Sequence, residues 1–102
     1  MRLNEIKYTD AKPIEGYGPG FFRIGGIVTH GGVLTGPTGT LVWGGYEDSA
    51  TLLDLAGKID VLFMGTGEDV AHIPAALREE LEEAGIGVEA MATPAAARTY
   101  NV

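Results

Sequence analysis

Cysteine is absent from this sequence and serine occurs once, and these two shortages exclude several kinds of chemistry. Disulfides, thiol catalysis and zinc sites built on thiolates all require cysteine. The single serine, Ser49, stands at the expected start of a helix and has no G-x-S-x-G motif around it. Nucleophilic catalysis would therefore need a residue that no motif marks, whereas acid–base catalysis by one positioned group stays open.

Basic residues are also scarce. Seven Lys and Arg stand against 14 Asp and Glu, for a net charge of -7 at pH 7. Because nucleic acids and anionic membrane faces attract basic surfaces, both are excluded as expected partners. His30 and His72 lack the spacing of a metal site, so no metal or cofactor is predicted.

Long apolar runs are missing as well, so the sequence predicts no segment that inserts into a membrane. Residues Met1 to Asp10 lack the apolar stretch of a secretory signal and carry Glu5 and Asp10. These features favour a cytoplasmic protein. With 102 residues, 45% of them hydrophobic, the chain is expected to form one globular domain over residues 1–102. Its 16 glycines fall mainly between the expected elements.

The first half of the chain has the short alternating runs and glycine pairs that are typical of β-hairpins. A glycine-rich turn is expected at 16–20. The predicted strands are Glu5–Thr9, Phe21–Ile24, Ile27–Thr35 with an interruption at Gly31-Gly32, and Thr40–Trp43.

The second half alternates helices with strands, which predicts parallel pairing through crossovers. Asp48 and Ser49 are typical of a helix start, and Gly57 of its end. The apolar run Ile59–Met64 predicts a strand covered on both faces, and Ile86–Met91 its parallel neighbour. Pro74 and Pro94 each favour a helix start. In the first of these two helices Ile73, Leu77, Leu81 and Ala84 share one face, Arg78, Glu79, Glu82 and Glu83 form the outer face, and Gly85 ends the helix.

Gly65-Thr66-Gly67 is the strongest candidate site. It follows the apolar strand and precedes a helix, at the sheet edge where ligands gather in α/β proteins. The sequence lacks the rest of a G-x-G-x-x-G or P-loop motif, so a tight turn without a ligand is the alternative. Thr93 would bring the start of the last helix to the same crevice. Further candidate lining residues are Arg98, Tyr100, Asn101 and Arg23, of which the two arginines are either ligands of an anion or ordinary surface cations.

Several short segments, taken in order, carry a family resemblance. They are Ile14-Glu15-Gly16-Tyr17-Gly18, Phe22-Arg23-Ile24, Gly32-Val33-Leu34, Trp43, Gly65-Thr66-Gly67, residues 85–91 and Arg98-Thr99-Tyr100-Asn101. The chain resembles the uncharacterised-function domain family that includes mitochondrial complex I assembly factor 3 and the adipogenesis-associated Mth-like domain protein. The resemblance implies an α/β fold with three layers, a central mixed sheet, flanking helices and an additional β-hairpin layer. It also implies a final helix that is shorter here than in relatives. For prokaryotic members, which the missing presequence fits, it implies no established enzymatic activity.

Two functions follow from these observations. The first is a non-enzymatic module that binds a protein partner in the assembly or maturation of a membrane respiratory complex, as the resemblance implies for the mitochondrial relative. The alternative is a protein or acid–base enzyme that binds a small anionic or carbonyl ligand at Gly65-Thr66-Gly67 and Arg98. The sequence does not fix the oligomeric state.

Overall fold

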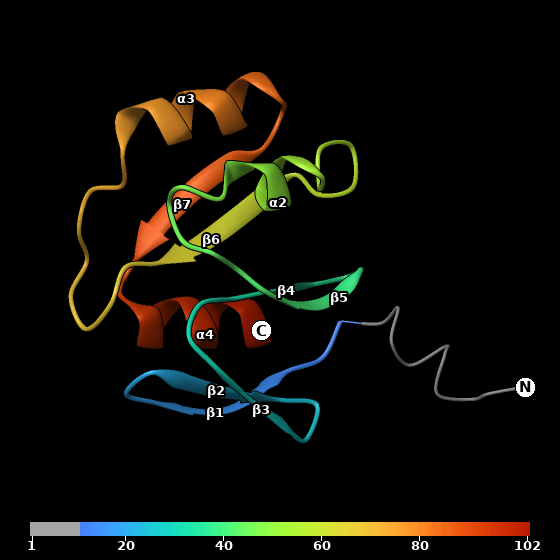
Figure 1. Cartoon of the computed structure of the whole chain (residues 1–102), viewed down its shortest axis with the longest axis vertical. Coiled ribbons are helices and arrows are strands. Elements are labelled where there is room, and N and C mark those ends of the chain that lie inside the picture. The colour runs from blue at the N-terminus through green and yellow to red at the C-terminus, as the bar shows by residue number, and fades with distance from the viewer. Residues whose placement is uncertain (1–10) are drawn as a thin grey trace, which may run out of the picture. The chain divides into compact units, whose positions relative to one another are not determined.

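The computed structural model describes residues 11–102, and the strand expected at Glu5–Thr9 lies outside them. The chain divides into two compact units, which meet at Gly44 and Gly45. Strands make up the regular structure described in the first unit, and the second combines three helices with two strands (Figure 1). The predicted α/β class is therefore confirmed.

Five short strands form two antiparallel sheets in the first unit. One sheet has the order β1-β2-β3 and the other pairs β4 with β5. Their bounds are β1 Ile14–Gly18, β2 Phe21–Ile24, β3 Ile27–His30, β4 Val33–Gly36 and β5 Gly39–Val42. The glycine-rich turn is shorter than predicted, because Gly16 to Gly18 belong to β1 and pair with β2. Trp43, expected at the end of the last strand, lies just beyond β5 and donates its N–H to the Gly32 carbonyl at 2.9 Å.

The hairpin between β2 and β3 shows why glycine is needed there. Ile24 pairs directly with Ile27, so only Gly25 and Gly26 form the loop. Both have positive φ, +60° and +82°. A two-residue turn with positive φ at both positions matches the twist of antiparallel strands, and glycine adopts it without steric cost. The pair Gly25-Gly26 thus fixes the register of this hairpin.

The second unit is built around a parallel strand pair. Strands β6, Val61–Gly65, and β7, Gly87–Met91, run parallel, with Leu62 opposite Val88, as the sequence predicts. Its helices are α2 Ser49–Leu53, α3 Ala75–Glu83 and α4 Thr93–Asn101. Helix α3 contacts β7 and helix α4 contacts β6, and Figure 1 shows them on opposite sides of the strand pair. The parallel and antiparallel pairings of the described residues thus lie in three separate sheets.

Helix α3 ends in a Schellman motif that anchors the core. Gly85, with φ +88°, donates its N–H to the Glu82 carbonyl at 3.0 Å, and Ile86 donates to the Leu81 carbonyl at 2.9 Å. Leu81 and Ile86 are both almost completely buried. The predicted apolar face of α3 is confirmed at its buried residues Leu77 and Leu81, whereas Ile73, also buried, lies just before the helix and Ala84 just after it. Strand β6 is less covered than predicted, since Met64 is its one buried residue and Val61 is 43% exposed.

Candidate functional site

The turn after β6 and the start of α4 meet, as the parallel pairing predicts. Thr66 donates its N–H to the Met91 carbonyl at 2.9 Å. Gly67 donates its N–H to Thr93 Oγ1 at 2.9 Å, and Thr93 returns its own N–H to the Gly67 carbonyl at 2.7 Å. The N–H groups of Thr66, Gly67 and Thr93, which were expected to face a ligand, therefore donate hydrogen bonds to other groups of the protein.

The contact between Gly65 and Thr93 is also sterically tight. A Cβ atom on Gly65 would lie 2.8 Å from Thr93 Oγ1 and 3.0 Å from Thr93 Cα. A threonine before a proline is a typical helix cap, yet α4 has no side-chain cap and begins at Thr93 itself. Its hydroxyl accepts the Gly67 N–H instead, because the chain following β6 passes directly beside the start of α4. Pro94, which has no N–H, removes a further donor from this helix end.

Thr66 organises the loop that follows the turn, a role that the sequence analysis missed. Its hydroxyl lies 2.8 Å from the Asp69 carbonyl and 3.2 Å from the Met91 carbonyl, and it accepts the Ala71 N–H at 3.0 Å. A threonine hydroxyl supplies one donor and two acceptor lone pairs, so these contacts use most of its capacity. The sequence feature that could have indicated this role is a threonine between two glycines at the end of a predicted strand.

The other candidates on α4 lie near its carboxyl end. Arg98 is exposed and forms no ion pair with any residue in the described range 11–102. It follows Thr93 by five residues, which places it about 7–8 Å along the helix and about 140° around it. Asn101 is exposed, whereas Tyr100 is half-buried. A ligand role for these residues stays a prediction.

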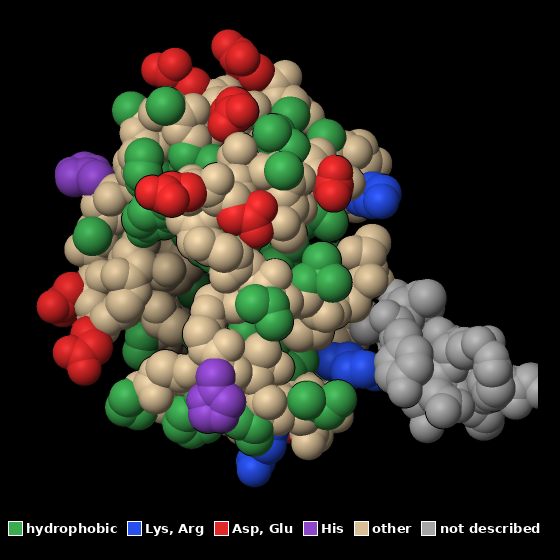
Figure 2. Space-filling view, in the orientation of Figure 1, with side chains coloured by type: hydrophobic (Ala, Val, Ile, Leu, Met, Phe, Trp, Pro, Cys, Tyr) green, Lys and Arg blue, Asp and Glu red, His purple; other side chains and the backbone are tan. Residues whose placement is uncertain are grey.

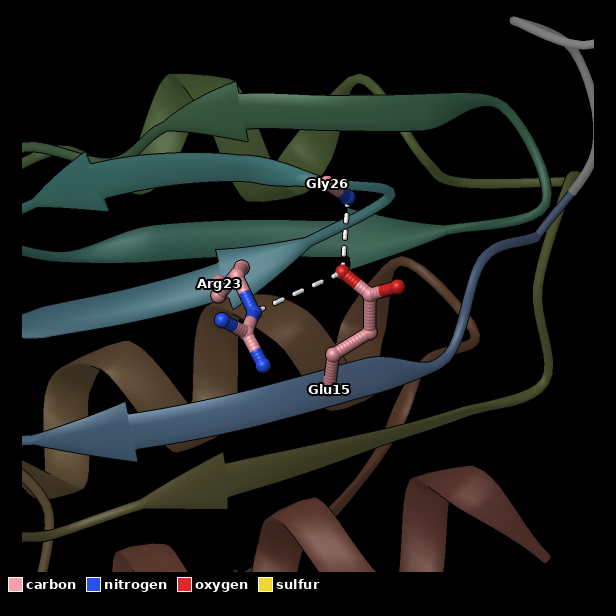
Figure 3. A network of polar contacts seen from close by, with 3 residues as sticks. All are labelled: Glu15, Arg23 and Gly26. Atoms are coloured by element: carbon pink, nitrogen blue, oxygen red, sulfur yellow. Dashed lines mark hydrogen bonds and ion pairs between the residues drawn. The ribbon is translucent and has the colours of Figure 1, made fainter.

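Arg23 belongs to β2 in the first unit and has a partner there. Figure 3 shows its guanidinium directed toward Glu15 on β1. The distance from Arg23 Nε to Glu15 Oε1 is 3.9 Å, and the same oxygen accepts the Gly26 N–H at 2.6 Å. Because both side chains are about half exposed, the ion pair adds little stability, and the bond to the hairpin turn is the stronger contact.

A hollow that the sequence analysis did not identify lies beside β7. It has a volume of about 510 Å³ and is lined by Val70, Ala71, His72, Arg78, Val88, Glu89 and Ala90. The sequence placed Arg78 on the wet face of α3, but it is half-buried. Its Nη1 donates to the Val88 carbonyl at 3.0 Å and lies 3.6 Å from Glu82 Oε2. Arg78 thereby joins α3 to the edge of β7.

Residues 11–102 lack both a membrane-spanning helix and a cluster of metal ligands. No helix in this range is long and apolar enough to cross a membrane. The same range contains no group of three or more His, Cys, Asp or Glu side chains placed to hold a metal ion.

Curated relatives match nearly the whole chain. An uncharacterized protein of Rhodobacter capsulatus is 48% identical over 102 residues, which is 100% of this chain and 82% of that protein. NADH dehydrogenase (ubiquinone) 1 alpha subcomplex assembly factor 3 of Danio rerio is 36% identical over 95 residues. That match covers 86% of this chain and 55% of the Danio rerio protein, so the chain spans about half of its length.

Solved structures share the fold. The crystal structure of a protein described as an outer membrane protein from Bartonella henselae has a TM-score of 0.80 and 33% identity, and the match covers 92% of this chain and 85% of that one. A Mth938-like domain from Bordetella pertussis has a TM-score of 0.69 and 25% identity, covering 88% and 76%. The family model for a protein of unknown function, DUF498/DUF598, matches residues 14–102. The family resemblance is confirmed, and the chain belongs to the DUF498/DUF598 family.

Proposed function

We propose that this protein is a protein-interaction module that acts in the assembly or maturation of a membrane respiratory complex. The observation that carries the proposal is the 36% identity over 95 residues to a protein named as an NADH dehydrogenase assembly factor. An assembly factor works by binding other polypeptides, and such binding uses surfaces rather than a catalytic constellation. The proposed location is the cytoplasm.

Exposed apolar side chains in the first unit support a binding role. On β3, Ile27 is 65% exposed and Val28 50%, and on β5, Leu41 is 56% exposed and Val42 68%. Adjacent residues of a strand point to opposite faces, so each of these strands offers apolar side chains on both faces. Contiguous apolar area left in water marks interaction sites in soluble proteins.

Capture from an extract of the native cell, with chemical cross-linking and mass spectrometry, tests this function. The bait is the wild-type chain, beside a Leu41→Glu/Val42→Glu variant and a control with Thr38→Glu and Thr40→Glu on the same exposed hairpin. We expect the wild type and the control to retain subunits of a respiratory complex, and the apolar-to-acidic variant to lose them. Retention of no such subunit by the wild type would refute the assembly role.

A fourth bait, Arg98→Glu, tests the pocket predicted from the sequence. Arg98 is exposed and unpaired within residues 11–102, so the substitution leaves no described contact broken. If the pocket takes part in the interface, we expect this variant to lose the captured subunits while its thermal unfolding stays unchanged. Equal capture by wild type and Arg98→Glu would remove Arg98 from the interface.

A further inference from the structure

One edge of the parallel strand pair carries unused backbone groups. In a parallel ladder, alternate residues of a strand direct both their N–H and C=O to the same neighbour. Gly87 donates to the Asp60 carbonyl at 2.9 Å and the Met91 carbonyl accepts from Thr66 at 2.9 Å, so the residues that face β6 are Gly87, Glu89 and Met91. Val88 and Ala90 therefore face away from β6.

The outward groups of Val88 and Ala90 have one described partner. Arg78 Nη1 occupies the Val88 carbonyl at 3.0 Å, which confirms that Val88 is directed outward. Within residues 11–102 no strand pairs with this edge, and β6 is the sole partner of β7. The Val88 N–H and both backbone groups of Ala90 are thus available, and an open strand edge of this kind is a template for pairing with another chain.

The edge also has an opposite wall. Val70, Ala71 and His72 line the same 510 Å³ hollow as Val88, Glu89 and Ala90. Figure 1 shows the segment between β6 and α3 running on the side of β7 that faces away from β6. The Thr66 hydroxyl fixes this segment through the Asp69 carbonyl and the Ala71 N–H. The edge and the loop together form a groove, which we name the β7 groove.

The net negative charge around the β7 groove favours a positively charged binding partner. Residues 45–102 carry eleven of the 14 acidic side chains but three of the seven Lys and Arg, for a net charge of -8. The charged residues that line the groove are Glu89 and Arg78, and Arg78 lies 3.6 Å from Glu82. Glu68 and Asp69 directly precede the wall of the groove. Figure 2 shows acidic side chains spread over the region that contains α3 and β7. An approaching segment that carries positive charge is attracted and oriented by this field, and an acidic one is repelled.

We propose that the β7 groove binds an extended, lysine- or arginine-bearing segment of a partner protein as an added strand beside β7. The partner backbone pairs with Ala90 and with the Val88 N–H, and its basic side chains meet Glu89 and the acidic loop. Main-chain hydrogen bonds supply affinity in this mode, and the alternating side chains supply selectivity. The inference rests on the proposed interaction function and names a second binding surface and the chemistry of its partner.

The test uses a fluorescein-labelled hexapeptide of alternating Lys and Val, with an alternating Glu and Val peptide of the same length as its control. Fluorescence anisotropy at low salt gives the affinity for the full chain, and amide chemical shifts locate the site. Ala90→Pro removes the outward N–H but no bond to β6, and proline is tolerated on an edge strand. Ala90→Val keeps the N–H, and is the matched control. Glu89→Lys is compared with Glu83→Lys, an equal charge change on an exposed residue outside the groove.

We expect the Lys peptide to bind and to shift the amides of Val88 and Ala90. Ala90→Pro weakens binding at least tenfold and Glu89→Lys at least threefold, whereas the two control variants stay within twofold. A Lys peptide with alternate N-methylated amides keeps the charge but loses strand pairing, so its failure to bind the wild type supports the proposal even if Ala90→Pro does not fold.

Two binding results would overturn the inference: the Glu peptide or the N-methylated peptide binding as tightly as the unmodified Lys peptide. Slow hydrogen exchange at Val88 and Ala90 in the free protein would also overturn it, because it would show that the edge is already paired.

The test is separate from that of the assembly role. Captured respiratory subunits together with no peptide binding would refute the β7 groove alone, and peptide binding without captured subunits would refute the assembly role alone.

Discussion

The contact between Gly65 and Thr93 makes a sharp prediction for Gly65→Ala. The new Cβ would lie 2.8 Å from Thr93 Oγ1, closer than real Cβ atoms approach other atoms, and 3.0 Å from Thr93 Cα, which is tighter than most real Cβ contacts. Backbone cannot move aside as a flexible side chain does, so the start of α4 must shift away from β6. Overpacking of this kind costs about 1–3 kcal/mol.

The shift would also strain the two hydrogen bonds between Gly67 and Thr93, at 2.9 and 2.7 Å. Each bond contributes about 0.5–1.5 kcal/mol to stability. We therefore expect Gly65→Ala to lower the free energy of unfolding by about 2–3 kcal/mol, which for a domain of this size lowers Tm by about 8–24 °C. Urea denaturation and a thermal scan, both followed by circular dichroism, measure the change.

Gly36→Ala is the matched control, because Gly36 also ends a strand, has no positive φ, and has no atom within 4 Å of the added Cβ. We expect its stability to stay within about 0.5 kcal/mol of wild type. If Gly65→Ala matched this control, the start of α4 would have to yield without cost, and the account of a tightly packed turn would be refuted.

Three other substitutions test local contacts by the same unfolding assay. Thr66→Val removes the hydroxyl that holds the Ala71 N–H and should cost about 1–2 kcal/mol, whereas Thr66→Ser keeps it and should cost less than half as much. Asp48→Ala removes the side chain that caps α2 through Thr51, so a loss of about 0.5–2 kcal/mol is expected, and no loss would show that the cap is dispensable. Leu81→Ala, at a fully buried position, should cost about 2–5 kcal/mol, and a smaller loss would mean that the core collapses around the cavity.

Local signals in the sequence were sufficient for much of the fold. Glycine pairs such as Gly25-Gly26 fixed the hairpins because their positive φ values are close to obligatory for two-residue loops. The apolar spacing of Leu77 and Leu81 located the buried face of α3, and Gly85 its end. The parallel pairing of β6 and β7 followed from the alternation of strands with helices.

Features that depend on tertiary contacts were harder to predict. Nothing in the sequence distinguishes a threonine that caps its own helix from one that accepts a bond from a distant glycine, as Thr93 does. The direction of Arg78 was missed because a strand edge beside α3 offers its guanidinium a carbonyl that periodicity cannot reveal. The β7 groove was missed for the same reason, since it joins residues from a loop, a helix and a strand.

The pairing pattern of the strands has a consequence for folding kinetics. Strand β1 pairs with β2, β2 with β3, and β4 with β5, so these contacts close loops of a few residues. Hairpins of this kind form in about 1–10 μs. Strands β6 and β7, in contrast, must bring together Val61 and Gly87 across the whole of α3. Closing this longer segment is entropically slower, and we expect mutations in the crossover to control the folding rate more than mutations in the hairpins.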